Sequence, residues 1–134
     1  MKAIHIKETT TSPAVTLDFD NNIYEISGCS RPEDVVAFYG QVIDWLITLK
    51  KSINADLIAK SAQTPLVFKF CYDYFNSSSA KYILDIILLV DDIYKNGLNV
   101  KIEWQYKKDD EDMLETGEEF TDLITCPIDF IAIS

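Results

Sequence analysis

Three consecutive serines, Ser77, Ser78 and Ser79, follow an asparagine in the stretch "YFNSSSAKYIL". A serine hydroxyl can act as a catalytic nucleophile, accept a phosphoryl group, or cap the first turn of a helix. Nucleophilic catalysis needs a neighbouring base, but the only histidine, His5, lies near the N-terminus, and no other base is placed beside the serines. Capping and phosphorylation are therefore the two roles that the serine run itself suggests.

A second group of chemically capable residues is an acidic cluster composed of Asp109, Asp110, Glu111, Asp112, Glu115, Glu118 and Glu119. Carboxylate oxygens are the ligands that Mg²⁺ and Ca²⁺ prefer, although the spacing is not that of an EF-hand loop. Acidic side chains also stabilise the first turn of a helix and keep its outer face solvated. The cluster is interpreted as a solvated helix face, with a protein-docking surface and a metal site as alternatives.

The serine run separates an expected strand from an expected helix. The stretch "TPLVFKFCYDY" alternates with a period of two, which predicts a strand with one face formed by Leu66, Phe68, Phe70, Tyr72 and Tyr74. Residues 78–95 have apolar side chains on more than one helical stripe and end at Asn96-Gly97, as a helix should. A helix start tolerates a phosphoryl group, because it presents free N–H groups and the positive end of the helix dipole.

The clearest helix signal is the stretch "SGCSRPEDVVAFYGQVIDWLITLKK". Ser30 and Glu33 have the spacing of a capping box, and Pro32 fits the first turn, where its missing N–H costs nothing. Apolar residues then recur at intervals of three and four, so they form one stripe that faces the core. We expect a long helix that begins after Ser30 and ends at Lys50 and Lys51.

The remaining segments are mainly strands. With the strand before the serine run, strands are expected over residues 3–6, 14–19, 22–26, 66–74, 98–106 and 126–134. Asp20-Asn21-Asn22 suits a hairpin turn with asparagine at positive φ, and Pro127 suits an edge strand. The acidic segment forms a loop and a short helix that is broken or bent at Gly117. This order predicts an α/β or α+β sandwich, a mixed sheet flanked by helices in a single domain spanning 1–134.

The formal net charge of −10 disfavours binding to nucleic acid or to an anionic membrane surface. No segment approaches the ~18 apolar residues needed to span a bilayer, and the first residues lack the apolar core of a signal peptide. Cys29, Cys71 and Cys126 are odd in number and far apart, which argues against a disulfide framework. A cytoplasmic protein with a protein partner is the simplest expectation.

Three stretches, in order, resemble the SiaC-type family of bacterial regulatory phosphoproteins. "SGCSRPEDVVAFYGQVIDWL" resembles the family's G-x-S-x-P-E-x-x-x-x-FY followed by a WL pair, and "YFNSSSAKYILDII" resembles its N-[ST]-S-S-x-K. "VKIEWQYKKDDEDMLETGEEF" resembles its W-x-Y followed by D-E-D-M-x-E-x-G-E. The three matches together cover nearly the whole chain.

The resemblance implies a STAS-like fold, similar to that of anti-sigma-factor antagonists, with no catalytic activity and no cofactor or metal. It implies a substrate of a partner serine/threonine kinase and of a PP2C-like phosphatase, which forms complexes with its partners as a monomer. The unphosphorylated form is expected to bind and activate an output protein, a diguanylate cyclase, which links the switch to cyclic-di-GMP and biofilm formation.

The family's modified residue is the hydroxyl residue after the asparagine, which carries over to Ser77. That position is commonly threonine in the family, and the adjacent Ser78 and Ser79 are second choices for the modified residue. Asn76, Ser78 and Ser79 would shape the phosphosite loop, and Lys81 would either pair with the phosphate or be a solvated surface residue. The expected partner-binding candidates are Asp109, Asp110, Glu111, Asp112, Met113, Glu115 and Glu118.

Two other functions stay open. The acidic cluster and a hydroxyl of the serine run could form a small metal-dependent enzyme, which tight binding of Mg²⁺ or Mn²⁺ would indicate. Alternatively, the chain is a protein-docking scaffold that is never modified, so its intact mass in cells would be the same whatever the kinase status.

Overall fold

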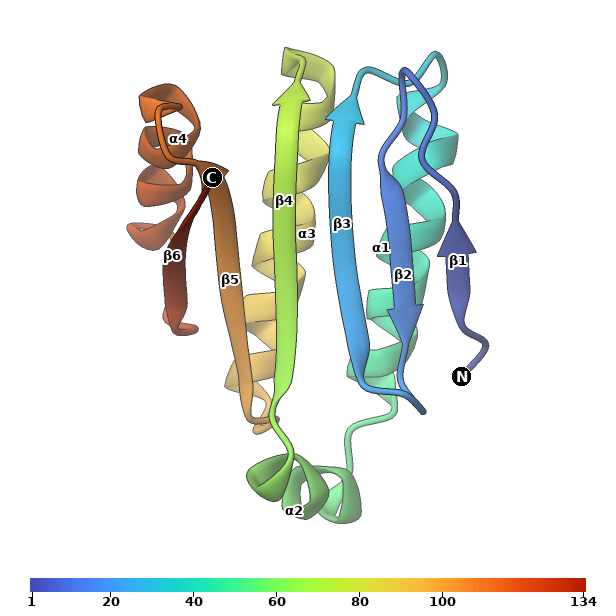
Figure 1. Cartoon of the computed structure of the whole chain (residues 1–134). Helices are drawn as coiled ribbons and strands as arrows, with labels where there is room; N and C mark the ends of the chain where they lie inside the picture. The colour runs from blue at the N-terminus through green and yellow to red at the C-terminus, as the bar shows by residue number, and fades with distance from the viewer.

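The computed structural model describes residues 1–134 and consists of one β-sheet and four helices (Figure 1). The strands are β1 (Ile4–Ile6), β2 (Ala14–Asp18), β3 (Ile23–Ser30), β4 (Leu66–Phe75), β5 (Val100–Lys107) and β6 (Ile128–Ile133). The helices are α1 (Val35–Lys51), α2 (Ala55–Gln63), α3 (Ser77–Lys95) and α4 (Glu111–Thr121). The hairpin turn between β2 and β3 is confirmed, since Asn22 has a φ of 56°. The predicted fold class, a mixed sheet with helices, is also confirmed.

The six strands lie side by side in the order of the sequence, with β1–β3 antiparallel and β3–β6 parallel. From β3 to β6, each new parallel strand lies on the same side of the preceding one. Right-handed crossovers between them therefore put the connecting helices on one face of the sheet. Figure 1 shows α1 and α3 together behind the sheet. The largest fully buried side chains between the two layers include Trp104, Tyr39, Phe70, Leu46 and Ile87. β6 is an edge strand, as predicted from its proline, and no helix has the length and apolar character that a membrane crossing requires.

Trp104 on β5 sets the position of α4. Its indole Nε1 donates a hydrogen bond to the carbonyl of Met113 (2.9 Å), and its ring packs edge-to-face on Phe120 with 5.4 Å between centroids. A Cβ at position 117 would lie 2.5 Å from Trp104 Cδ1, so only glycine allows this close approach. The expected break at Gly117 is wrong, because α4 runs without interruption through this residue.

α1 begins later than the capping-box spacing predicts. β3 continues to Ser30, and the helix begins at Val35 with Asp34 as its N-cap. The Asp34 Oδ1 accepts a hydrogen bond from the N–H of Ala37 (3.0 Å). The predicted cap at Ser30 is therefore wrong, because its buried side chain bonds other hydroxyl groups instead of a helix N–H.

α2 is a short helix that the apolar periodicity does not predict. Asn54 caps it by accepting a hydrogen bond from the N–H of Leu57 (2.9 Å), and Asp56 lies in its first turn. Ser61 is the only buried side chain among its nine residues, so its pattern carries little signal. Figure 1 places α2 across the end of the sheet at which β4 begins.

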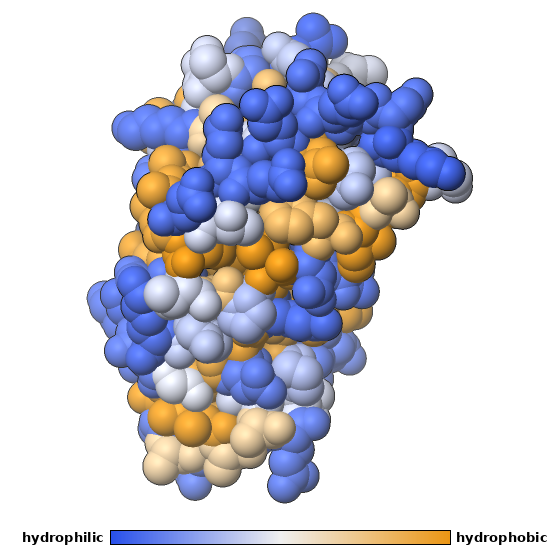
Figure 2. Space-filling model, turned by 90° about the vertical axis from the view of Figure 1, so that its left-hand side faces the viewer, coloured by the Kyte–Doolittle hydropathy of each residue, from blue (hydrophilic) through white to orange (hydrophobic).

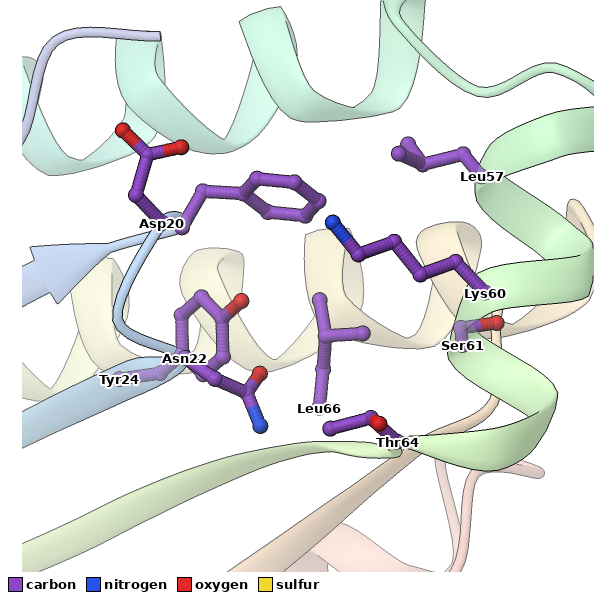
Figure 3. Close-up of a pocket in the computed structure, with 9 residues that line it drawn as sticks. Asp20, Asn22, Tyr24, Leu57, Lys60, Ser61, Thr64 and Leu66 are labelled. Atoms are coloured by element: carbon purple, nitrogen blue, oxygen red, sulfur yellow. The ribbon is translucent and has the colours of Figure 1, made fainter.

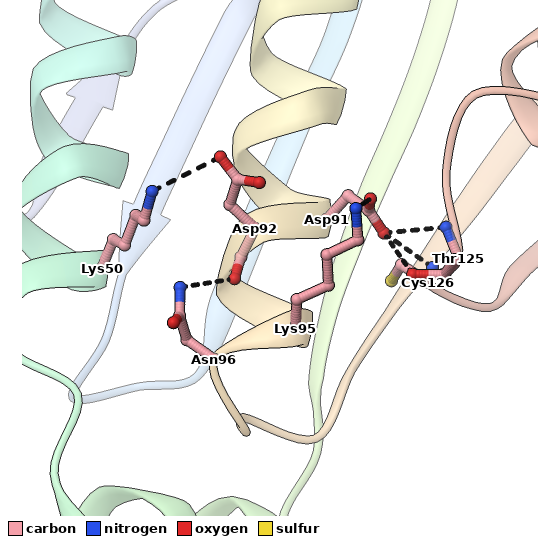
Figure 4. Close-up of polar contacts among 7 residues, drawn as sticks. All are labelled: Lys50, Asp91, Asp92, Lys95, Asn96, Thr125 and Cys126. Carbon is pink, nitrogen blue, oxygen red and sulfur yellow. Dashed lines mark hydrogen bonds and ion pairs between the residues drawn. The ribbon is translucent and has the colours of Figure 1, made fainter.

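Asp91 on α3 holds the segment that leads into β6 (Figure 4). Its carboxylate is 2% exposed, and Oδ1 accepts hydrogen bonds from the N–H groups of Thr125 (2.9 Å) and Cys126 (2.8 Å). Lys95 pairs with Oδ2 at 3.1 Å. Burial alone would raise the pKa of Asp91, but these hydrogen bonds and the ion pair outweigh it, so the pKa lies below its ordinary value. Asp91 is therefore ionised and fully partnered at neutral pH.

Replacing Gly117 with alanine should destabilise the protein by about 1–3 kcal/mol, because the added Cβ overpacks against Trp104. Chemical denaturation of the purified variant measures the change. Gly40→Ala in α1 is the matched control: nothing lies within 4 Å of a Cβ added there. That helix should gain about 0.5–1 kcal/mol from the better helix former. A Gly117→Ala protein as stable as the wild type would contradict this packing.

Asp91→Asn should lower the free energy of unfolding by about 1.5–3 kcal/mol at neutral pH, through loss of charged hydrogen bonds. Because the folded pKa is depressed, the stabilisation by Asp91 is complete above its unfolded pKa of about 4. It is lost as the pH falls through the folded pKa, so the two proteins should converge in stability in acid. The control Asp92→Asn removes only a surface pair with Lys50 (3.4 Å) and should cost less than about 1 kcal/mol. A difference between wild type and Asp91→Asn that persists undiminished to about pH 2 would exclude this explanation.

Candidate functional site

The carboxyl ends of the parallel strands β3, β4 and β5 meet at one edge of the sheet, at the top of Figure 1. The chain leaves these strands after Ser30, Phe75 and Lys107. The serine run therefore starts α3 at this edge, and the acidic segment starts α4 at the same edge. Two candidate regions that are far apart in the sequence are thus brought to the same end of the molecule.

Asn76 forms the junction between β4 and α3. Its backbone N–H donates to the carbonyl of Ser30 at the end of β3 (3.1 Å), and its Oδ1 accepts from the N–H of Ser79 (2.9 Å). Asn76 is therefore the N-cap of α3, and Ser77 is the first helical residue. The N–H groups of Ser77 and Ser78 lie in the first turn, where no intrahelical acceptor exists, so they can serve an anion.

The three serines of the run have different surroundings. Ser77 and Ser78 are exposed, whereas Ser79 is completely buried. The Ser79 hydroxyl donates to the carbonyl of Ser30 (3.2 Å) and accepts from the hydroxyl of Ser30 (2.9 Å). Another protein can reach the hydroxyls of Ser77 and Ser78 in the folded chain, but modification of Ser79 would require the first turn of α3 to open.

A buried hydroxyl cluster lies next to this junction and consists of Ser30, Tyr39, Tyr72 and Ser79. The Tyr39 hydroxyl is hydrogen-bonded to the Ser30 hydroxyl and lies 3.3 Å from that of Tyr72. Burial raises the pKa of both tyrosines, so the phenols stay neutral and available for hydrogen bonding. The cluster joins β3, β4, α1 and α3 at one point. Sequence periodicity does not predict it, because Tyr39 and Tyr72 fit the pattern of ordinary core residues.

A β-bulge at Asp73 changes the direction of the aromatic residues at the end of β4. The pairing with β3 skips Asp73, so the alternation of faces shifts after it. Phe75 consequently packs against Tyr72, with 5.4 Å between ring centroids, and Tyr74 is 52% exposed. The prediction that Tyr74 continues the core-facing side is wrong. An exposed aromatic side chain therefore lies just before Ser77.

Lys81 lies one turn after Ser77 on α3, and residues at this spacing are neighbours on a helix surface. Its side chain is exposed, and its Nζ lies 5.3 Å from the centre of the Tyr82 ring. The ion pairs of the chain do not include Lys81. Its charge is therefore available to an anion at the helix start.

The acidic residues follow the outer side of α4. Figure 2, viewed from the side of β6 and α4, shows hydrophilic residues gathered at the top, above a hydrophobic band. The exposed members are Asp109, Glu111, Asp112, Glu115, Glu118 and Glu119. Asp110 instead caps α4 by accepting a hydrogen bond from the N–H of Met113 (3.0 Å), and Met113 is 8% exposed. The Met113 side chain therefore belongs to the core and not to the exposed acidic face.

The geometry places no catalytic partner beside the serines. His5 lies on β1, with β2 and β3 between it and β4, and its Nε2 is 3.7 Å from the Asp18 carboxylate. No group of three or more His, Cys, Asp or Glu side chains is placed to share a metal ion. The edge presents an accessible hydroxyl at a helix start, beside an exposed tyrosine and an acidic helix. Such an arrangement suits recognition and modification by other proteins.

Comparison with known proteins points to one family. A family model described as SiaC family regulatory phosphoprotein matches residues 6–133. An uncharacterized protein of Pseudomonas aeruginosa (strain UCBPP-PA14) is 30% identical over 127 residues, which cover 95% of this chain and 94% of that protein.

Solved structures agree with this match. The crystal structure of apo-SiaC from Pseudomonas aeruginosa has a TM-score of 0.81 at 30% identity, covering 98% of this chain and 100% of that chain. A chain in the crystal structure of the diguanylate cyclase SiaD in complex with its activator SiaC, from the same species, has a TM-score of 0.83 at 29% identity. That match covers 97% of this chain and 99% of the other.

The different surroundings of the serines can be tested by a matched pair of substitutions. Ser79→Ala should lower the free energy of unfolding by about 1–2 kcal/mol, because it removes two buried hydrogen bonds, one to the hydroxyl and one to the carbonyl of Ser30. Ser78→Ala removes an exposed hydroxyl and should change stability by less than about 0.5 kcal/mol. Chemical denaturation distinguishes the two, and equal stabilities would contradict the assigned hydrogen bonds.

Proposed function

The chain belongs to the SiaC family of regulatory phosphoproteins, and from this premise we propose that it is a non-catalytic switch controlled by phosphorylation of Ser77. The unphosphorylated form binds and activates a diguanylate cyclase in the cytoplasm, and phosphorylation releases the cyclase. The observation that carries the proposal is the exposed hydroxyl of Ser77 on the first residue of α3. The related structure of SiaD with its activator SiaC supports the choice of output protein.

Two arguments favour Ser77 over its neighbours. It occupies the position after Asn76 that the family motif assigns to the modified residue. Ser79 is buried in the junction, and Ser78, although exposed, does not occupy that position. None of the hydrogen bonds that fix the junction uses the Ser77 side chain. A kinase can therefore modify Ser77 without disturbing the start of α3.

A phosphoryl group on Ser77 would change the surface charge while the fold stays intact. It adds about −1.5 to −2 charges at pH 7. The first turn of α3 contains no acidic residue to repel it, and the free N–H groups and Lys81 offer it favourable partners. The modification is therefore tolerated locally, as a reversible switch requires.

The docking surface of this proposal combines Tyr74, Ser77 and the exposed acidic side of α4. Exposed tyrosines are frequent energetic centres of protein interfaces, because they bury a large ring at little entropic cost. A phosphate next to such a centre would have to be desolvated when the cyclase binds, which weakens the complex. A partner serine/threonine kinase and a PP2C-like phosphatase would set the phosphorylated fraction, and with it cyclic-di-GMP synthesis and biofilm formation.

Reconstitution with the purified cyclase and kinase of the same organism tests the proposal. The unmodified protein should raise the rate of cyclic-di-GMP synthesis, and treatment with kinase and ATP should weaken its apparent affinity for the cyclase by about tenfold or more. Ser77→Ala should activate the cyclase equally before and after kinase treatment, because it has no hydroxyl to modify. Ser78→Ala is the matched control and should respond like the wild type. Loss of activation by kinase-treated Ser77→Ala would show that another residue is the switch.

A further inference from the structure

A cavity of about 140 Å³ lies between α2 and the β2–β3 hairpin (Figure 3). Its apolar walls are formed by Phe19, Leu57 and Leu66 together with the ring of Tyr24. Leu66 begins β4, whereas Ser77 follows the other end of that strand, so ten residues of extended chain separate the cavity from the serine run. At ~3.3 Å per residue the two sites are ~30 Å apart. The cavity therefore shares no residue with the proposed switch.

Tyr24 lines this cavity, and its hydroxyl, which Figure 3 shows on the side of the site, has no hydrogen-bond partner. Tyr24 is 2% exposed, and its Oη is the only buried side-chain oxygen or nitrogen that lacks a hydrogen bond in the chain. The Tyr24 ring is held in place by two other aromatic rings. Its centroid lies 4.7 Å from that of Phe68, on which it stacks, and 6.0 Å from that of Trp45. Buried phenols normally have a hydrogen-bond partner, so this hydroxyl indicates a missing one.

The Tyr24 hydroxyl is neutral and can donate a hydrogen bond. Burial raises its pKa, and the nearby carboxylates of Asp18 and Asp20 raise it further. The phenol is therefore neutral throughout the physiological range and acts as a hydrogen-bond donor. A partner that contains an acceptor would therefore satisfy its O–H group.

Lys60 supplies a second donor at the mouth of the cavity. Its Nζ lies 5.9 Å from the centre of the Phe19 ring, and Figure 3 shows it directed toward the middle of the site. None of the ion pairs of the chain involves Lys60. In the same view the carboxylate of Asp20 points away from the cavity. Lys60 is thus the cation that a bound group would meet.

Two polar side chains of the wall, those of Ser61 and Asn22, are already hydrogen-bonded. The Ser61 hydroxyl donates to the carbonyl of Ile58 (2.9 Å) and accepts from the N–H of Asn99 (3.0 Å). The amide of Asn22 donates to the carbonyl of Pro65 (3.3 Å). The unpartnered polar groups of the site thus include one buried hydroxyl, that of Tyr24, and one ammonium group, that of Lys60, beside apolar walls.

We propose that this cavity binds a small carboxylate with an apolar body, its carboxylate held between the Tyr24 hydroxyl and the Lys60 ammonium. A dry cavity of ~150 Å³ holds a benzene-sized molecule, so an aromatic ring or a branched aliphatic chain fits the volume. Charge-assisted hydrogen bonds from both donors satisfy the acceptor. The inference concerns ligand binding at the opposite end of the sheet and does not rest on the proposed function.

Ligand binding would also anchor α2. Ser61 is the only buried side chain of this helix, and Ile58 is 37% exposed, so few side-chain contacts hold α2 to the sheet. A ligand that touches Leu57 and Lys60 on one side and Tyr24 on the other bridges the helix and the hairpin. Binding should therefore raise the melting temperature, since it stabilises only the folded state.

Three probes with the same ring and different head groups test the proposal: benzoate, benzamide and benzylamine. Benzoate should bind saturably with a dissociation constant on the order of 1 mM, as expected for a ligand of this size. It should shift the amide NMR signals of Tyr24, Leu57, Lys60 and Leu66 and raise the melting temperature. Benzamide should bind more weakly, and benzylamine should not bind, because Lys60 repels its charge.

Two variants with matched controls assign the donors. Tyr24→Phe should bind benzoate about tenfold or more weakly, while its own melting temperature stays equal or rises, because the lost hydroxyl had no partner in the chain. Lys60→Gln should also weaken benzoate binding. Tyr94→Phe and Lys51→Gln, which lie outside the cavity, should bind it like the wild type. If Tyr24→Phe fails to fold, benzoate binding by Lys60→Gln still tests the proposal, because Lys60 is exposed and its replacement does not disturb the core.

Three results would overturn the proposal. The first is the absence of saturable benzoate binding, and the second is equal affinity of benzoate for the wild type and Lys60→Gln. The third is a crystal structure grown with benzoate in which only ordered water bonds the Tyr24 hydroxyl.

Discussion

A small set of hydrogen bonds fixes the end of β4 and the start of α3, and the position of Ser77 depends on them. The backbone N–H of Asn76 donates a hydrogen bond to Ser30 at the end of β3, and the Asn76 side chain accepts one from the N–H of Ser79. The Ser79 hydroxyl in turn donates to the carbonyl of Ser30. These groups are buried or half-buried, so leaving one of them unpaired would cost about 1–3 kcal/mol. The start of the helix is therefore fixed, and with this start Ser77 faces solvent.

The same arrangement explains how a stable junction can also present a site of modification. Ser79 contributes to the buried hydroxyl cluster, while the side chain of Ser77 takes no part in the bonds that hold the junction. A charge added to Ser77 would therefore change the affinity for a partner that docks at the carboxyl ends of the strands, and would leave the packing beneath Ser77 unchanged. The cavity around Tyr24 lies at the other end of β4, so the proposed ligand binding and the proposed docking would use separate surfaces of one sheet.

Elements that bury many side chains are predictable from the sequence, and elements that depend on distant partners are not. The sequence patterns of β4, α1 and α3 are clear because each of these elements buries many apolar side chains between the sheet and the helices. α2 has one buried side chain and shows no such pattern. The spacing of Ser30 and Glu33 predicts a local cap, yet tertiary hydrogen bonds draw Ser30 into the core. The bulge at Asp73 depends on pairing with β3, so the exposure of Tyr74 is also not encoded locally.

Peptide mass spectrometry of the protein isolated from its own cells tests the central claim most directly, because it reads the modified residue without reconstitution. In cells that lack the PP2C-like phosphatase, a single phosphoryl group should accumulate on Ser77, and in cells that lack the kinase the same peptide should be unmodified. Phosphate found on Ser78, on Ser79 or outside the serine run would contradict the proposed switch, as would an unmodified peptide in every strain.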